Sequence, residues 1–84
     1  MKQAARPLRI AVIGAGLIGA RHAAHVAAGA QTRLACVVDP TPAGEAVAQA
    51  HGAPWRTEIG VALAQDRPDA VIVATPNRLH VEHA

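Results

Sequence analysis

The sequence predicts an α/β fold in which helices flank a parallel sheet. Short runs rich in Val, Ile and Leu alternate along the 84 residues with longer Ala-rich stretches, and such alternation is typical of parallel strands joined by crossover helices. The first apolar run leads directly into the pattern G-x-G-x-x-G at residues 14–19, which opens a helix in dinucleotide-binding units. We therefore expect the first four strands of a Rossmann-type, doubly wound sheet, in the order 3-2-1-4.

The first half of the chain predicts two strands with one helix between them. Residues 8–13 are mostly apolar and run into a glycine, so they predict the first strand. Residues 17–28 are rich in Ala, the strongest helix former, and Gly29 ends that helix. A second apolar run, best defined over residues 34–38, predicts the second strand.

The second half continues the alternation. Pro42 suits the first turn of a helix over residues 42–50, which stops near Gly52. A short strand is expected next, because Pro54 can only begin or edge a strand. The remaining elements are expected at residues 54–56 (strand), 58–65 (helix, closed by Pro68), 69–75 (strand) and from Asn77 or Arg78 onward (helix).

The predicted sheet is expected to continue beyond this sequence. The last helix would have barely two turns before Ala84. The strand at residues 69–75 would also lie at an open apolar edge, which promotes aggregation unless further strands cover it. We therefore expect residues 1–84 to be the N-terminal part of a dinucleotide-binding domain, followed by the rest of that domain and by a second domain.

The glycines of residues 14–19 suit the binding of a dinucleotide pyrophosphate. Gly14 permits a tight turn off the strand, Gly16 lets backbone N–H groups approach the phosphates, and Gly19 allows close packing of the new helix. The start of that helix presents unpaired N–H groups and a partial positive charge to an anion.

Asp39 lies twenty positions after Gly19, at the end of the second strand. A carboxylate there can accept hydrogen bonds from both hydroxyls of the adenosine ribose, and it would repel a 2′-phosphate. Pro40 and Thr41 follow, with no Arg or Lys to bind such a phosphate. These residues favour NAD over NADP as the cofactor. The alternative is that Asp39 only caps the turn that follows its strand.

Composition excludes several other classes of function. The formal net charge is +2 and the basic residues are scattered, so nothing favours binding of nucleic acid or of a membrane surface. No stretch reaches the ~20 apolar residues of a membrane span, and the N-terminal residues do not form a signal peptide. The single cysteine, Cys36, lies in an apolar run and predicts a small buried side chain. We expect a cytoplasmic protein.

Residues 74–84 form a second group of polar side chains at a strand end. Pro76 stiffens the turn, Asn77 can cap the next helix or offer its amide to a ribose or phosphate, and His80 can face a cofactor. In open α/β sheets ligands bind at this carboxyl edge, beside the switch in strand order. The alternatives are a plain N-cap for Asn77 and a solvent-exposed helical histidine for His80.

These motifs together resemble the Gfo/Idh/MocA oxidoreductases, the family that includes glucose–fructose oxidoreductase and inositol dehydrogenase. The similar segments are Ile13-Gly-Ala-Gly-Leu-Ile-Gly19, Ala20-Arg-His22, Val37-Val-Asp-Pro40 and Asp69-Ala-Val-Ile-Val-Ala-Thr-Pro-Asn77 with His80. The resemblance covers nearly all of the chain in order. It implies an N-terminal Rossmann domain and a C-terminal domain that binds substrate and builds dimers or tetramers.

The resemblance also implies roles for individual residues, which are expectations here. Gly14, Gly16, Leu17 and Ile18 would line the pyrophosphate, Asp39 would hold the adenosine ribose, and Thr75, Pro76, Asn77 and His80 would flank the nicotinamide half. The family's catalytic lysine belongs to a Glu-Lys-Pro signature that this sequence lacks, and the only lysine is Lys2. No catalytic residue is therefore expected within this segment.

The resemblance predicts hydride transfer between NAD and a secondary alcohol of a sugar, inositol or related polyol. Two alternatives stay open at this point. One keeps the fold but changes the substrate, as in proteins similar to biliverdin reductase or to amino-acid dehydrogenases. The other is a non-catalytic module that senses NAD or serves as a scaffold.

The histidine pairs and the single tryptophan do not predict an additional binding site. His22 and His25, like His80 and His83, are three residues apart, but no Cys, Asp or Glu with metal-ligand spacing accompanies them. No metal site is therefore expected. Trp55, the only tryptophan, is expected to be a partly buried anchor under the second helix rather than a platform for adenine.

Overall fold

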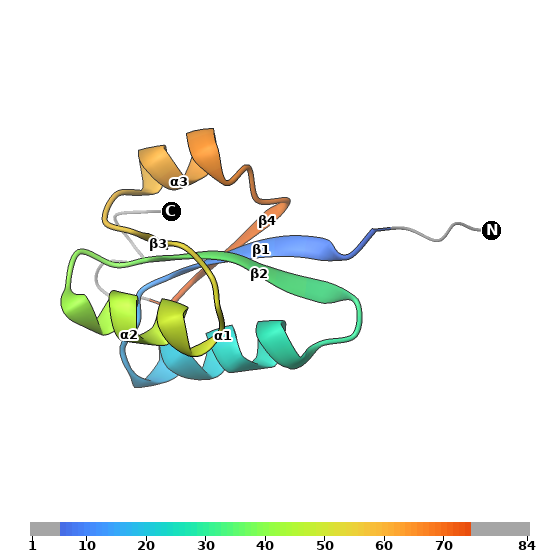
Figure 1. Cartoon of the computed structure of the whole chain (residues 1–84), viewed down its shortest axis with the longest axis horizontal. Coiled ribbons are helices and arrows are strands. Elements are labelled where there is room, and N and C mark those ends of the chain that lie inside the picture. Colours follow the sequence, from blue (N-terminus) through green and yellow to red (C-terminus); the bar gives the residue numbers. More distant parts are fainter. Residues whose placement is uncertain (1–5, 75–84) are drawn as a thin grey trace.

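The computed structural model describes residues 6–74, and residues 1–5 and 75–84 lie outside that range. The elements follow one another as strand and helix in turn (Figure 1). Their bounds are β1 Leu8–Ile13, α1 Leu17–Ala28, β2 Thr32–Val38, α2 Pro42–Ala50, β3 Trp55–Arg56, α3 Ile59–Gln65 and β4 Ala70–Val73.

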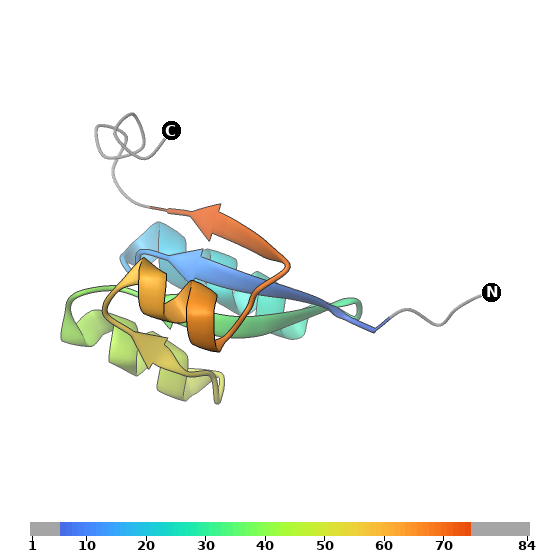
Figure 2. The ribbon, with the colours of Figure 1, turned by 90° about the horizontal axis from the view of Figure 1, so that it is seen from above.

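The four strands form one parallel sheet in the order β3-β2-β1-β4, which confirms the expected topology. β3 and β4 lie at opposite edges of the sheet, and β1 and β2 lie in its centre (Figure 2). Helices α1 and α2 cover one face, and α3 covers the other (Figure 1). The switch in strand order therefore falls between β1 and β4, on the side where the glycine-rich loop leaves β1.

The strand ends differ from the sequence expectations for local reasons. β2 begins at Thr32, two residues earlier than expected, because Thr32 already pairs with Leu8. β3 omits Pro54, which has no N–H for the ladder. β4 is shorter than the expected residues 69–75. It begins at Ala70, after Asp69, whose carboxylate accepts the N–H of Arg9 at 2.9 Å, and it ends at Val73.

The helices agree closely with the expected ranges. α1 and α2 have the expected bounds, and α3 begins one residue late because Glu58 has the extended backbone of an N-cap. None of the helices within residues 6–74 has the length and apolar character that crossing a bilayer requires. The helix expected from Asn77 or Arg78 lies outside the described residues.

The core consists of small side chains on both faces of the sheet. On the α3 face the buried cluster contains Ala11, Cys36, Val38 and Ala62, and on the α1–α2 face it contains Ala15, Val37 and Ala48. Alanines on the helices let them approach the sheet closely, but each buries little area. Cys36 is fully buried as predicted, and burial, reinforced by Asp66, raises the pKa of its thiol to about 12. Its role is packing.

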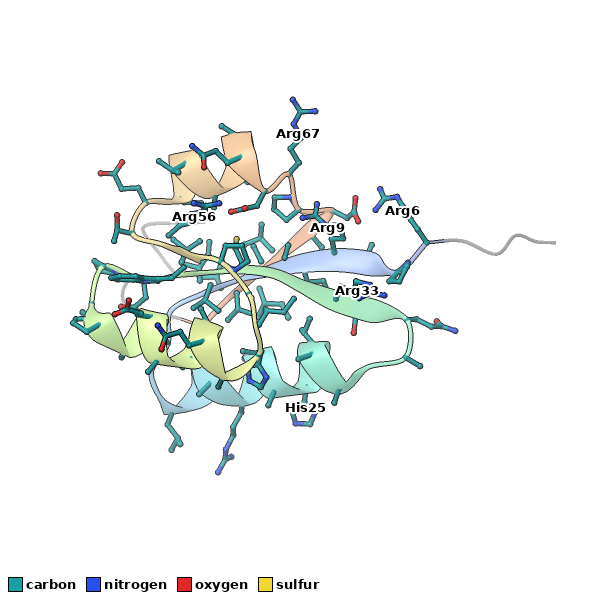
Figure 3. The ribbon with its side chains drawn as sticks, viewed as in Figure 1. Arg6, Arg9, His25, Arg33, Arg56 and Arg67 are labelled. Carbon is teal, nitrogen blue, oxygen red and sulfur yellow. The ribbon has the colours of Figure 1, made fainter. Side chains whose placement is uncertain are left out.

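An ion pair joins β3 to the C-cap residue of α3. Arg56, which lies between the sheet and α3 (Figure 3), donates from Nε and Nη2 to the two carboxylate oxygens of Asp66 at 2.8 and 2.9 Å. The side chain of Asp66 is only 7% exposed. The bond from Arg56 outweighs burial and lowers the pKa of Asp66 below its usual range.

Asp66→Asn is expected to lower the free energy of unfolding by about 2 kcal/mol at pH 7, because it leaves a partly buried guanidinium without its carboxylate. The pKa of Asp66 is depressed in the folded state, so the stabilisation is present above about pH 4 and is lost as the pH falls through the folded-state pKa. Urea denaturation at pH 7 and pH 3 measures both effects. Asp69→Asn is the control, because its partner Arg6 is 69% exposed and an exposed ion pair contributes little stability. If Asp69→Asn lost as much free energy of unfolding as Asp66→Asn, the proposed importance of burial at Asp66 would be contradicted.

Candidate cofactor site

The loop after β1 turns sharply at the carboxyl edge of the sheet. Gly14 has a φ of +98°, a conformation that residues with a Cβ rarely adopt. Its N–H donates to Val38 O at 2.8 Å, and the N–H of Ala74 donates to Ile13 O at 2.8 Å. The loop therefore begins between the ends of β2 and β4, at the switch in strand order where open α/β sheets bind ligands.

Gly19 allows α1 to pack against this turn. A Cβ built on Gly19 would lie 1.9 Å from the carbonyl oxygen of Gly14 and 2.7 Å from its carbonyl carbon. No side chain larger than hydrogen fits there without movement of the backbone. The close contact is thus between the first turn of α1 and the end of β1, and it sets the direction in which α1 leaves the sheet.

The N-terminus of α1 is open to solvent and uncapped. Gly16 is its N-cap, no side chain caps the helix, and its first turn contains no acidic residue. A Cβ on Gly16 would meet nothing within 4 Å, and the next two residues, Leu17 and Ile18, are 74% and 62% exposed. Unpaired N–H groups with free space before them, and no competing carboxylate in the helix, fit a bound pyrophosphate.

The carboxylate of Asp39 contacts the backbone of this loop. Its Oδ2 accepts the N–H of Ala15 at 2.8 Å, and its Oδ1 accepts both the N–H and the hydroxyl of Thr41, at 2.7 and 2.5 Å. Asp39 is only 9% exposed. The carboxylate therefore joins the glycine-rich loop to the start of α2, as the turn-capping alternative predicts. Its binding to a ribose stays a prediction.

The backbone of Asp39 is held by β3. Its N–H donates to Arg56 O at 2.9 Å, and Trp55 Nε1 donates to its carbonyl oxygen at 2.8 Å. Trp55 is partly buried and packs beside α2, as expected. Gly44 makes room for this arrangement, because a Cβ there would lie 2.6 Å from the Cβ of Asp39 and 2.7 Å from Trp55 Nε1.

Asp39 is ionised through the neutral pH range. Burial acts to raise the pKa of its carboxyl, but the hydrogen bonds from the Thr41 hydroxyl, the Thr41 N–H and the Ala15 N–H outweigh it and lower the pKa below its usual range. A buried, charged carboxylate at this position suits an uncharged diol and opposes a phosphate.

Four of the labelled arginines lie away from this edge. Arg6, Arg9, Arg33 and Arg67 all lie toward the end of the sheet where β1 begins (Figure 3). A hollow of about 340 Å³, which includes Arg33 and His51 in its lining, lies where β2 begins and where α1 and α2 end. An anion at the glycine-rich loop would therefore be held by backbone N–H groups rather than by these arginines.

The structure brings together five of the residues that the sequence singled out, namely Gly14, Gly16, Leu17, Ile18 and Asp39. The other four, Thr75, Pro76, Asn77 and His80, lie outside the described residues. His22 and His25 are exposed on α1, and residues 6–74 contain no group of three or more His, Cys, Asp or Glu that could hold a metal ion.

Two contributors to the site, Ala15 and Thr41, were not predicted from the sequence. The spacing Asp39-Pro-Thr41 was a usable signal for the second, because Asp side chains commonly accept the backbone N–H two residues ahead. Ala15 donates from a loop 24 residues away in the sequence. No local pattern predicts that contact.

A protein-family model matches most of the chain. Residues 8–84 match the GFO_IDH_MocA model, described as an oxidoreductase family with an NAD-binding Rossmann fold. Among curated proteins, an inositol 2-dehydrogenase of Rhizobium meliloti (strain 1021) is 41% identical over 76 residues, which are 89% of this chain and 23% of the relative. A D-glucoside 3-dehydrogenase of Escherichia coli (strain K12) is 36% identical over 81 residues, 92% of this chain and 23% of the relative.

Solved structures of similar proteins superpose well on this chain. A myo-inositol dehydrogenase of Corynebacterium glutamicum ATCC 13032 superposes with a TM-score of 0.82 at 35% identity, over 92% of this chain and 23% of the other. GenD2 of gentamicin A biosynthesis, in complex with NAD, superposes with a TM-score of 0.80 at 36% identity, over 89% of this chain and 22% of the other. The chain thus spans about a quarter of the length of the relatives that it matches.

Proposed function

The chain belongs to the Gfo/Idh/MocA oxidoreductase family with its NAD-binding Rossmann fold, and from that premise we propose that it is the cofactor-binding part of an NAD-dependent dehydrogenase acting on a secondary alcohol of a sugar, inositol or related polyol. One observation carries the proposal: the open, uncapped N-terminus of α1 lies beside the ionised carboxylate of Asp39. Backbone N–H groups and a carboxylate at one edge complement the two polar parts of an adenine dinucleotide, its pyrophosphate and its ribose.

Each group has a distinct task in this proposal. The N–H groups at the start of α1, with Gly14 and Gly16 leaving room, bind the pyrophosphate. Asp39 accepts hydrogen bonds from the ribose and holds the adenosine half. By family resemblance, Thr75, Pro76, Asn77 and His80 flank the nicotinamide half. When bound, the cofactor supplies the hydride chemistry, and this part of the protein supplies its position.

The names of the relatives support the proposed substrate class. Two of them act, by name, on inositol and on a D-glucoside. Since the relatives are about four times longer than this chain, we propose that the groups that bind substrate and move its proton lie outside residues 1–84. A substrate and oligomerisation domain, a dimeric or tetrameric assembly and a cytoplasmic location complete the proposal.

Asp39→Asn is expected to weaken NADH binding by about tenfold to a hundredfold, because hydrogen bonds to a charged group are worth roughly 1.5–3 kcal/mol each. The same change is expected to narrow the preference for NADH over NADPH, since it removes the charge that opposes the 2′-phosphate. Titration of the intact protein with each reduced cofactor, followed by cofactor fluorescence, measures both.

Asp69→Asn is the matched control, because this carboxylate lies at the start of β4 and pairs with Arg6. It is expected to leave both affinities unchanged. Equal binding of NADH and NADPH by the native protein, or an unchanged NADH affinity in Asp39→Asn, would contradict the proposed role of Asp39.

A further inference from the structure

Thr41 occupies the N-cap of α2 but does not cap that helix. Its backbone is extended, with φ −110° and ψ 161°, and Pro42 follows at the first helical position. Threonine is a preferred N-cap because its hydroxyl can accept an N–H from the first turn. Here no side-chain capping bond forms, and the hydroxyl instead donates to Oδ1 of Asp39. The side chain of Thr41 is thus committed to the carboxylate that the proposed function assigns to the ribose.

The carboxylate of Asp39 has too few free acceptor positions for a ribose. An ionised carboxyl group offers about four lone-pair positions. Three protein donors take three of them, namely the N–H of Ala15, the N–H of Thr41 and the hydroxyl of Thr41, so about one position is left. The adenosine ribose brings two donors, its 2′- and 3′-hydroxyls. One protein donor must therefore leave before both can bind.

The hydroxyl of Thr41 is the donor that can leave most easily. The other two donors are backbone N–H groups, and the Ala15 bond is buried in the loop that Gly14 and Gly16 define. Thr41 is exposed, and its hydroxyl moves by rotation about one side-chain bond. After rotation the hydroxyl can accept an N–H from the first turn of α2, as an N-cap threonine commonly does, and it can share the N–H of Gly44 that already donates to Thr41 O at 3.0 Å.

We propose that the Thr41 hydroxyl competes with the adenosine ribose for Asp39 and so limits how tightly this site holds NAD. The inference rests on the proposed function, since it requires that Asp39 bind the ribose. It makes Thr41 a specificity-determining residue: a ligand with both ribose hydroxyls must displace Thr41, whereas a ligand with one can use the remaining acceptor position.

The test is a titration of the intact protein with NADH and with its analogue that lacks the adenosine 2′-hydroxyl. Thr41→Val keeps the branched shape and removes the hydroxyl. It is expected to bind NADH about threefold to tenfold more tightly, which corresponds to one hydrogen bond that no longer has to be broken. Its affinity for the deoxy analogue is expected to equal that of the native protein.

Two further variants complete the design. Thr41→Ser keeps the hydroxyl and is expected to bind NADH as the native protein does, while Thr41→Ala, which also lacks the hydroxyl, replaces the valine variant if that variant does not fold. An unchanged NADH affinity without the hydroxyl, or weaker binding of both ligands, would overturn the inference. An Asp39→Asn variant that binds NADH normally would instead show that the proposed role of Asp39 fails, so the two failures are distinguishable.

Discussion

Gly19→Ala is expected to destabilise the fold by about 3 kcal/mol or more, the largest effect of any single methyl group that we predict. The added Cβ would lie 1.9 Å from Gly14 O, an atom of the backbone rather than the end of a flexible side chain. Relief requires that α1 move away from the end of β1, and this opens the packing of α1 on the sheet. Urea denaturation of the intact protein measures the loss.

Gly60→Ala is the matched control for this prediction. Gly60 also lies in a helix, α3, but a Cβ there would meet nothing within 4 Å. Alanine is favoured over glycine in a helix, so Gly60→Ala is expected to raise the free energy of unfolding by up to about 1 kcal/mol. Similar destabilisation by Gly19→Ala and Gly60→Ala would contradict the close contact between Gly19 and Gly14.

Gly16→Ala is expected to leave the fold nearly intact and to weaken NADH binding by about tenfold to a hundredfold. The Cβ meets no protein atom within 4 Å, and the φ of Gly16, −67°, is open to alanine. Loss of the N-cap glycine changes the free energy of unfolding by about 1 kcal/mol at most. The methyl group enters the space before the N–H groups of α1, where it would displace a phosphate from one or two charge-assisted hydrogen bonds.

The two glycines thus separate stability from binding. Urea denaturation and an NADH titration are applied to both variants. We expect the larger loss of unfolding free energy in Gly19→Ala, and a loss of NADH affinity without a comparable loss of stability in Gly16→Ala. A Gly16→Ala protein that is folded and binds NADH with native affinity would show that the phosphates do not approach α1 at Gly16.

Much of this fold could be predicted because glycine and proline residues lie where helices begin or end. Gly29 ends α1 and Pro42 begins α2, and both helices have the bounds expected from the sequence. The strand order followed from the β-α alternation and the glycine pattern. β3 was harder, because its two residues have no periodicity of their own and are positioned by pairing with β2.

The sequence predicted several of the residues that form the site but not the hydrogen bonds between them. The glycines and Asp39 stood out by type and spacing. The bond from Ala15 to Asp39 joins two loops that meet only after the sheet forms, and the pairing of Arg56 with Asp66 depends on where α3 crosses the sheet. Contacts of this kind follow from tertiary placement, which no local pattern encodes.

The most direct test of the central claim, that NAD binds at the start of α1 beside Asp39, is amide hydrogen exchange of the intact protein with and without saturating NADH. The account predicts slower exchange over residues 14–19 and at Asp39 and Thr41, because the bound cofactor would cover these segments and restrict the opening of their hydrogen bonds. It predicts no change around Arg33 and His51, which line the separate hollow. Unchanged exchange over residues 14–19 while NADH is bound, or protection confined to that hollow, would contradict it.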